Sequence, residues 1–189
     1  MQWDVLKRRD CAFSDLERWQ HELFLKVQKN RELGFFLISE PRPTYTYGRN
    51  ADPKGLLKID AQAAVHSVSR GGQWTYHGPG QILIYPIVSL EALGLHRKAI
   101  RSFLEDFRGS ALRCLQRWNV PAVALENPFG IYAEANKLAS FGIAVEDGIT
   151  LHGMAIYLSD QSAAFQGIHP CGVPGQLTTS LHKYRPDLT

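Results

Sequence analysis

The sequence lacks most of the features that mark membrane-spanning and secreted proteins. Its 189 residues contain no uncharged apolar run of about 18 residues, the minimum for a membrane-spanning helix. Residues 1–10 carry charges where a signal peptide has an apolar segment, and three scattered cysteines are too few to indicate a disulfide framework. We therefore expect a cytoplasmic protein with reduced thiols and no membrane association.

Charge of one sign and low-complexity sequence are also scarce. The formal net charge of +3 is too small to indicate nucleic-acid binding. The composition, 44% hydrophobic and 21% charged, is that of an ordinary globular protein, and no segment rich in Pro, Gly or Ser interrupts it. Because chains divide more often beyond about 250 residues, we expect one domain over residues 1–189.

Apolar periodicity predicts a mixture of helices and strands. Ser14 and Glu17 have the spacing of a capping box, and apolar residues at helical spacing then continue toward Gly34. Further patterns predict strands over 34–39, 44–47, 65–69 and 82–88, and a helix over 97–118. The order of these elements indicates an α+β domain, with a mixed or antiparallel β-sheet packed with helices.

A hairpin is predicted from residue 137 to residue 158. Asp147 and Gly148 form a favoured two-residue turn, so Glu146 faces Ile149 and counting outward places Lys137 opposite residue 158. Strand alternation then puts Lys137 on the apolar face that includes Ala139 and residues 141, 143 and 145, and hence toward a core. Burial disfavours the charged form of an amine and lowers its pKa from about 10.4, so this lysine is a candidate proton carrier, although it could also extend to solvent from the strand start.

The segment over residues 70–81 is unusually rich in glycine, with four glycines in twelve residues. Glycines in an ordinary loop cost backbone entropy, whereas next to a ligand they allow close approach of the main chain. The segment is neither a Walker loop nor a dinucleotide-binding motif, because it lacks the lysine of the first and the third glycine of the second. We expect it to line a ligand site; a glycine-rich strand connection with a buried histidine is the structural alternative.

Cys171 is the candidate nucleophile. It lies between Pro170 and Gly172, which suits an exposed thiol on a turn, whereas Cys114 lies on the apolar stripe of its helix and is expected to be buried. A nearby lysine ammonium lowers the pKa of a thiol from about 8.5 and favours the reactive thiolate. His77 and His152 are rival bases, which leaves a Cys–His arrangement open. Cysteine and histidine spacings do not indicate a metal site.

Three blocks of the sequence together resemble the octanoyltransferases of lipoate biosynthesis. The resemblance spans about residues 34–183 and includes a strand-and-loop over 44–49. Its blocks are the following: Arg70-Gly71-Gly72-Gln73-Trp74-Thr75-Tyr76-His77 with Gly78-Pro79-Gly80-Gln81; Lys137-Leu138-Ala139-Ser140-Phe141-Gly142 with His152-Gly153-Met154-Ala155; and Pro170-Cys171-Gly172.

The resemblance implies the fold of lipoate and biotin protein ligase catalytic domains and a Cys/Lys dyad. Cys171 would carry the acyl group as a thioester, and Lys137 would lower the pKa of its thiol. The sequence departs from the family pattern at Tyr157, at Trp74 and over 134–136, which bears on pocket shape and chain length. The implied substrate-binding residues are Arg70, Gly71, Gly72, Gln73, Trp74, Thr75, Tyr76, His77, Ser140, Phe141, Gly142, Gly153, Met154 and Ala155.

The implied reaction moves an octanoyl group from acyl carrier protein, where it is held as a phosphopantetheine thioester, to a lysine of a lipoyl domain. The acceptors would be the lipoyl domains of 2-oxoacid dehydrogenase complexes and the glycine cleavage H protein. No cofactor, metal or nucleic acid is expected. An ATP-dependent lipoate or biotin protein ligase is the alternative enzyme, and a non-catalytic binder of lipoyl domain or carrier protein is the alternative outside enzymes.

Overall fold

The computed structural model describes residues 1–58, 60, 62–169 and 177–188. Its main helices are α1 (Phe13–Lys29) and α2 (Ile100–Arg117), and α3 (Ser162–Phe165) and α4 (Leu181–Tyr184) are single turns. The strands are β1 (Gln2–Cys11), β2 (Leu33–Pro41), β3 (Thr44–Tyr47), β4 (Ala64–Ser67), β5 (Trp74–His77), β6 (Gln81–Val88), β7 (Ala122–Glu126), β8 (Phe129–Ala133), β9 (Asn136–Glu146) and β10 (Ile149–Tyr157).

The strands form two sheets, and the predicted α+β class with a mixed sheet is confirmed. The large sheet has the order β1-β2-β6-β10-β9-β8-β7 and is antiparallel except for the parallel pair β1–β2 at its edge. The small sheet has the order β4-β3-β5, in which β3 and β4 are parallel. Strand β1 was not predicted, because most of its side chains are exposed and give it no apolar pattern.

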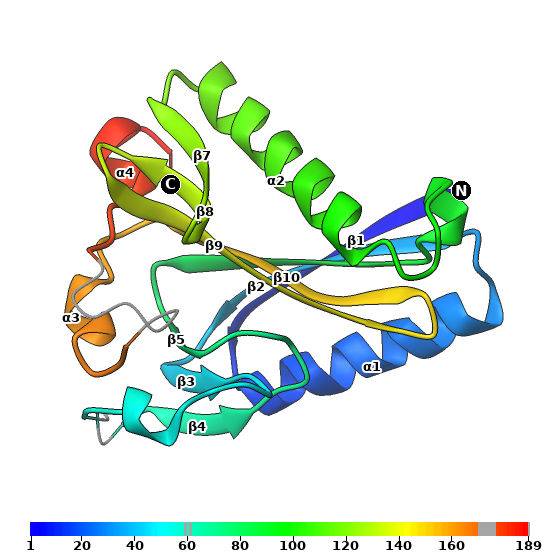
Figure 1. The fold of residues 1–189 in the computed structure, drawn as a ribbon, viewed down its shortest axis with the longest axis horizontal. Coiled ribbons are helices and arrows are strands. Elements are labelled where there is room, and N and C mark those ends of the chain that lie inside the picture. Colours follow the sequence, from blue (N-terminus) through cyan, green and yellow to red (C-terminus); the bar gives the residue numbers. More distant parts are fainter. Residues whose placement is uncertain (59, 61, 170–176, 189) are drawn as a thin grey trace.

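The helices lie on opposite faces of the large sheet, and an apolar core fills each space (Figure 1). Helix α1 packs Leu16, Leu23 and Val27 against β2, β6 and β10, and this core continues into the small sheet. Helix α2 packs over β7, β8 and β9 with Phe103 and Leu115. No helix within the described residues has both the length and the apolar character needed to cross a bilayer.

The predicted hairpin turn is confirmed. Asp147 and Gly148 have φ of 47° and 72°, the positive pair that a two-residue turn of this type requires. The register runs as counted, from the pair Ile149–Glu146 to the pair Ile156–Ala139. Strand β9 is thus correctly placed along its length beside β10.

Two local predictions are wrong. Helix α1 begins at Phe13, and its N-cap residue Ala12 has no side-chain hydrogen bond, so Ser14 lies inside the helix and does not form a capping box. Cys114 is exposed rather than buried, since α2 lies against the sheet on a narrower stripe than its apolar pattern suggests.

Candidate active site

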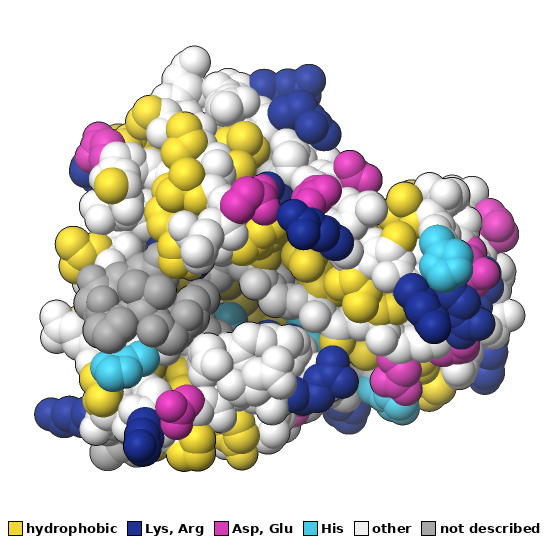
Figure 2. Space-filling view, in the orientation of Figure 1, with side chains coloured by type: hydrophobic (Ala, Val, Ile, Leu, Met, Phe, Trp, Pro, Cys, Tyr) yellow, Lys and Arg dark blue, Asp and Glu magenta, His cyan; other side chains and the backbone are white. Residues whose placement is uncertain are grey.

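A pocket of about 80 Å³ lies between the glycine-rich segment and the β9–β10 hairpin. Figure 2 shows a hollow on this face, between the part of the molecule that contains α2 and the part that contains the small sheet. This pocket is lined by all but one of the described residues that were predicted for the site. The exception is Tyr76, which packs into the adjacent core against Tyr45. The lining residues also include His152, which was predicted only as a rival base, and five that were not predicted for the site: Leu83, Tyr85, Tyr157, Phe165 and Thr178.

Arg70 holds the glycine-rich loop in place. Its side chain turns inward, and one terminal nitrogen donates hydrogen bonds of 3.0 Å to the carbonyl oxygens of Gly71 and Gln73. The other nitrogen donates to the carbonyl and hydroxyl oxygens of Thr46 on β3, at 3.2 and 2.9 Å. Arg70 therefore ties the pocket wall to the small sheet through charge-assisted hydrogen bonds.

Gly48 and Gly72 allow this loop to fold tightly. A Cβ atom on Gly48 would lie 2.5 Å from the carbonyl oxygen of Gly72, and other loop carbonyls are nearby. Gly72 has φ of 89°, a conformation that other residues rarely adopt. The glycines were predicted to let the main chain approach a ligand. In the structure they let the main chain at Gly48 pack closely against the carbonyl groups of the glycine-rich loop.

Both rival histidines are buried and neutral. Burial lowers the pKa of His77 to about 3 and that of His152 to about 4, and the positive charge of Arg70 contributes to both shifts. Nδ1 of His77 lies 3.2 Å from Oε1 of Gln81, and Nε2 of His152 lies 3.0 Å from Oγ of Ser69. Such weakly basic imidazoles are poor acceptors for a thiol proton near neutral pH.

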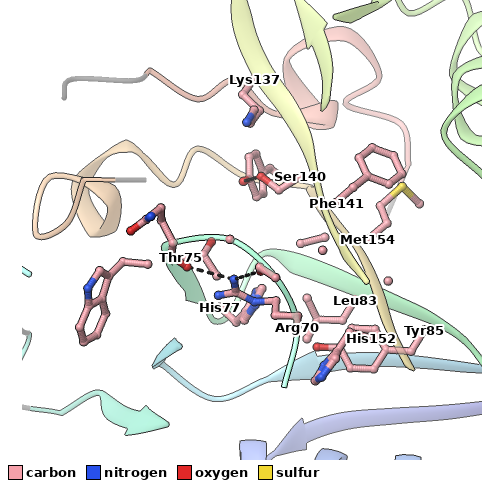
Figure 3. A pocket seen from close by; sticks show the side chains of 18 of the residues that line it. Arg70, Thr75, His77, Leu83, Tyr85, Lys137, Ser140, Phe141, His152 and Met154 are labelled. Atoms are coloured by element: carbon pink, nitrogen blue, oxygen red, sulfur yellow. Dashed lines mark hydrogen bonds between the residues drawn. The ribbon is translucent and has the colours of Figure 1, made fainter. Parts of the chain in front are cut away.

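Lys137 is 2% exposed and extends into the pocket from the start of β9. Its predicted face is wrong, because Leu138 is an extra residue where β9 pairs with β8 and strand alternation breaks there. Leu138 and Ala139 both pack under α2, whereas Lys137 lines the pocket with Ser140. Its amine points toward Ser140 (Figure 3) and lies 5.3 Å from the ring centre of Tyr132.

Two hydroxyl groups meet beside Lys137 in the pocket. The oxygens of Ser140 on β9 and Tyr157 on β10 are 2.5 Å apart and share a hydrogen bond. Tyr157 is 1% exposed and packs on Phe165, so its ring occupies part of the pocket wall. Tyr157 is one of the departures from the family pattern, and its hydrogen bond with Ser140 was not predicted.

Cys171 lies outside the described residues, and of the chain beside residues 170–176 it is Thr178 that lines the pocket. Before them, the backbone N–H of His169 donates to the carbonyl oxygen of Gly55. After them, the Lys137 N–H donates to the Leu177 carbonyl oxygen, and the Thr179 N–H donates to the Lys137 carbonyl oxygen. The chain that follows Cys171 therefore pairs directly with the backbone of Lys137.

The fold is similar to that of solved lipoate protein ligases. A bipartite lipoate protein ligase from Thermoplasma acidophilum, solved in a study of its E2 lipoyl domain, has a TM-score of 0.71 at 12% identity, covering 100% of this chain and 71% of that one. The family model for the lipoyl protein ligase A/B catalytic domain matches residues 16–189. The chain belongs to this family.

Several curated relatives are named octanoyltransferases. That of Halorhodospira halophila is 35% identical over 147 residues, or 78% of this chain and 65% of its own length. That of Alkaliphilus metalliredigens is 30% identical, covering 97% of this chain and 85% of its own. The resemblance seen in the sequence is confirmed, and the chain spans slightly less than two thirds of the Halorhodospira protein.

Proposed function

We propose that this protein transfers an octanoyl group from acyl carrier protein to a lysine of a lipoyl domain, through a thioester on Cys171. The observation that carries the proposal is the burial of the Lys137 amine in the pocket, beside the backbone that follows residues 170–176. The relatives are named octanoyltransferases, which supports octanoyl as the transferred group. The Thermoplasma ligase was studied with an E2 lipoyl domain, which supports a lipoyl domain as the acceptor.

In the first half-reaction, Lys137 takes the thiol proton of Cys171. The Cys171 sulfur then attacks the thioester carbonyl carbon of the donor, a new C–S bond forms, and the bond to the pantetheine sulfur breaks. The leaving pantetheine thiolate receives the proton from Lys137. The products are the acyl-enzyme and free carrier thiol, and the exchange of one thioester for another is nearly balanced in energy.

In the second half-reaction, the neutral amine of the acceptor lysine attacks the acyl-enzyme. Lys137 takes the proton that the nitrogen loses, the amide bond forms, and Cys171 leaves as a thiolate. Converting a thioester to an amide is downhill, so neither step requires ATP or a metal. The low pKa values of His77 and His152 favour Lys137 over either histidine as the proton carrier.

Mass spectrometry of the protein incubated with octanoyl carrier protein tests the proposal. We expect an octanoyl adduct on Cys171 that is lost in Cys171→Ser and forms far more slowly in Lys137→Ala. Lys183→Ala is the matched control, since Lys183 is an exposed lysine paired with Glu134 on the surface. An unchanged adduct in Lys137→Ala contradicts the dyad.

The same preparation distinguishes the alternatives. Pyrophosphate release with free octanoate or lipoate and ATP would identify an ATP-dependent ligase. A stable complex with carrier protein or lipoyl domain, with no adduct and no transfer, would identify a binder. Either result would overturn the proposed acyl transfer.

A further inference from the structure

The side chains of β10 alternate between the two faces of the large sheet, except at His152. Leu151, Ala155 and Tyr157 belong to the core on the side of α1, and Met154 and Ile156 pack on the side of α2. Alternation places residue 152 on the α2 side. His152 instead lines the pocket on the other side.

A local change in the backbone turns this side chain around. His152 has φ of 59°, which is uncommon for any residue other than glycine and more so within a strand. Its N–H donates a 2.6 Å hydrogen bond to Oε1 of Gln20, which is buried on α1. Gly153 follows, where a Cβ atom would lie 2.1 Å from the carbonyl oxygen of Ile84 and 2.9 Å from Cδ of Pro86.

The structure around this kink therefore maintains a costly conformation. A residue held in the left-handed region is strained and persists where its surroundings impose it, often at a functional site. Here a buried acceptor on α1 and the close approach of β6 at Gly153 impose it. The consequence is that an imidazole is placed in the pocket.

The imidazole lies at the end of the pocket away from Lys137. Figure 3 shows Lys137 and Ser140 at one end, and Leu83, Tyr85 and His152 at the other. Leu83, Tyr85 and His152 are 0%, 5% and 3% exposed, so this end is closed. The ring of His152 lies edge-on to Tyr85 at 5.7 Å, and its Nε2 is hydrogen-bonded to Ser69.

We propose that His152 is a specificity-determining residue, whose ring stops the methyl end of the acyl chain and limits its length. This inference rests on the proposed function, which places the thioester carbon near Lys137. The chain then runs along the pocket from Ser140 past Arg70, whose Cδ atom occupies the space that a side chain on Gly142 would fill, toward the other end (Figure 3). Its last carbons meet Leu83, Tyr85 and His152.

The substitution His152→Gly tests this cleanly, because glycine adopts the required φ without strain while the ring is removed. The assay measures kcat/KM for octanoyl, decanoyl and dodecanoyl carrier-protein thioesters. Each buried methylene is worth about fourfold in affinity, so the decanoyl-to-octanoyl ratio should rise by about fifteenfold. His152→Asn, which keeps a residue tolerant of this φ but shortens the side chain, should give a smaller rise.

Two control variants separate chain length from other effects. Asn119→Gly makes the same backbone change at an exposed residue with φ of 58° outside the pocket, and it should leave the ratio unchanged. Ser69→Ala removes the hydrogen bond but keeps the ring, and it too should leave the ratio unchanged.

The outcomes distinguish this inference from the function on which it rests. If the unmodified protein transfers octanoyl groups but both His152 variants keep its chain-length ratio, His152 does not set the length. A rise in the ratio in Ser69→Ala equal to that in His152→Gly would also overturn the inference, because loop position rather than the ring would then decide. No transfer by the unmodified protein from any donor would instead refute the proposed function.

Discussion

Replacing Arg70 by leucine should destabilise the whole protein, not only the loop that contains it. Arg70 is 9% exposed and donates hydrogen bonds to acceptors on Thr46, Gly71 and Gln73. Thr46 is fully buried, so water cannot readily replace the guanidinium there. Leucine fills part of the space but offers no donor.

The expected loss follows from the acceptors left behind. A buried polar group without a partner costs about 1–3 kcal/mol, and the two oxygens of Thr46 are the most enclosed of the four acceptors. The loop carbonyls of Gly71 and Gln73 can recover part of the loss from solvent. We expect a decrease of about 3–5 kcal/mol in the free energy of unfolding, a large part of the stability of an ordinary domain.

Equilibrium unfolding in urea measures this decrease. Arg101→Leu is the matched control, because the Arg101 side chain is 85% exposed and its ion pair with Glu105 on α2 lies in solvent, where such pairs contribute little to stability. Arg70→Lys keeps the charge but not the forked geometry and should fall between the two. A decrease below about 1 kcal/mol in Arg70→Leu, with an unchanged slope against urea, would refute the role assigned to this side chain.

Three further predictions concern the same site. Gly48→Ala should lower the unfolding free energy by about 1–3 kcal/mol, measured in urea, because its Cβ would overlap carbonyl oxygens of the loop. Stability should also fall in acid: His77 and His152 have pKa values of about 3 and about 4 in the folded protein, against about 6.5 unfolded. The contribution of the two histidines to the unfolding free energy is complete above about pH 6.5. Below that pH the unfolded chain binds protons, and at pH 5 each histidine has lost about 2 kcal/mol of this contribution. In His77→Gln the thermal unfolding midpoint should therefore depend less on pH. Tyr157→Phe removes the hydroxyl that pairs with Ser140 and should cost about 1 kcal/mol in thermal unfolding, whereas no loss would show that the pair is not stabilising.

Local sequence was sufficient where neighbouring residues determine the conformation. The Asp147-Gly148 turn requires two residues tolerant of positive φ, and the register of the hairpin follows from counting outward from it. The apolar spacing of α1 and α2 likewise identified both helices, with errors of a few residues at their ends. The grouping of the glycine-rich segment with Lys137 was implied by family resemblance, and not by any local pattern.

Only the tertiary structure decided how the side chains of the site are directed. The bulge at Leu138 depends on the pairing of β9 with β8, and it moves Lys137 to the pocket face. Arg70 turns inward because β3 presents the oxygens of Thr46 to it. His152 faces the pocket because Gln20, distant in sequence, accepts its N–H. Each of these contacts joins residues from separate strands or helices. The alternation of side chains along a single strand depends only on adjacent residues, so it could not predict them.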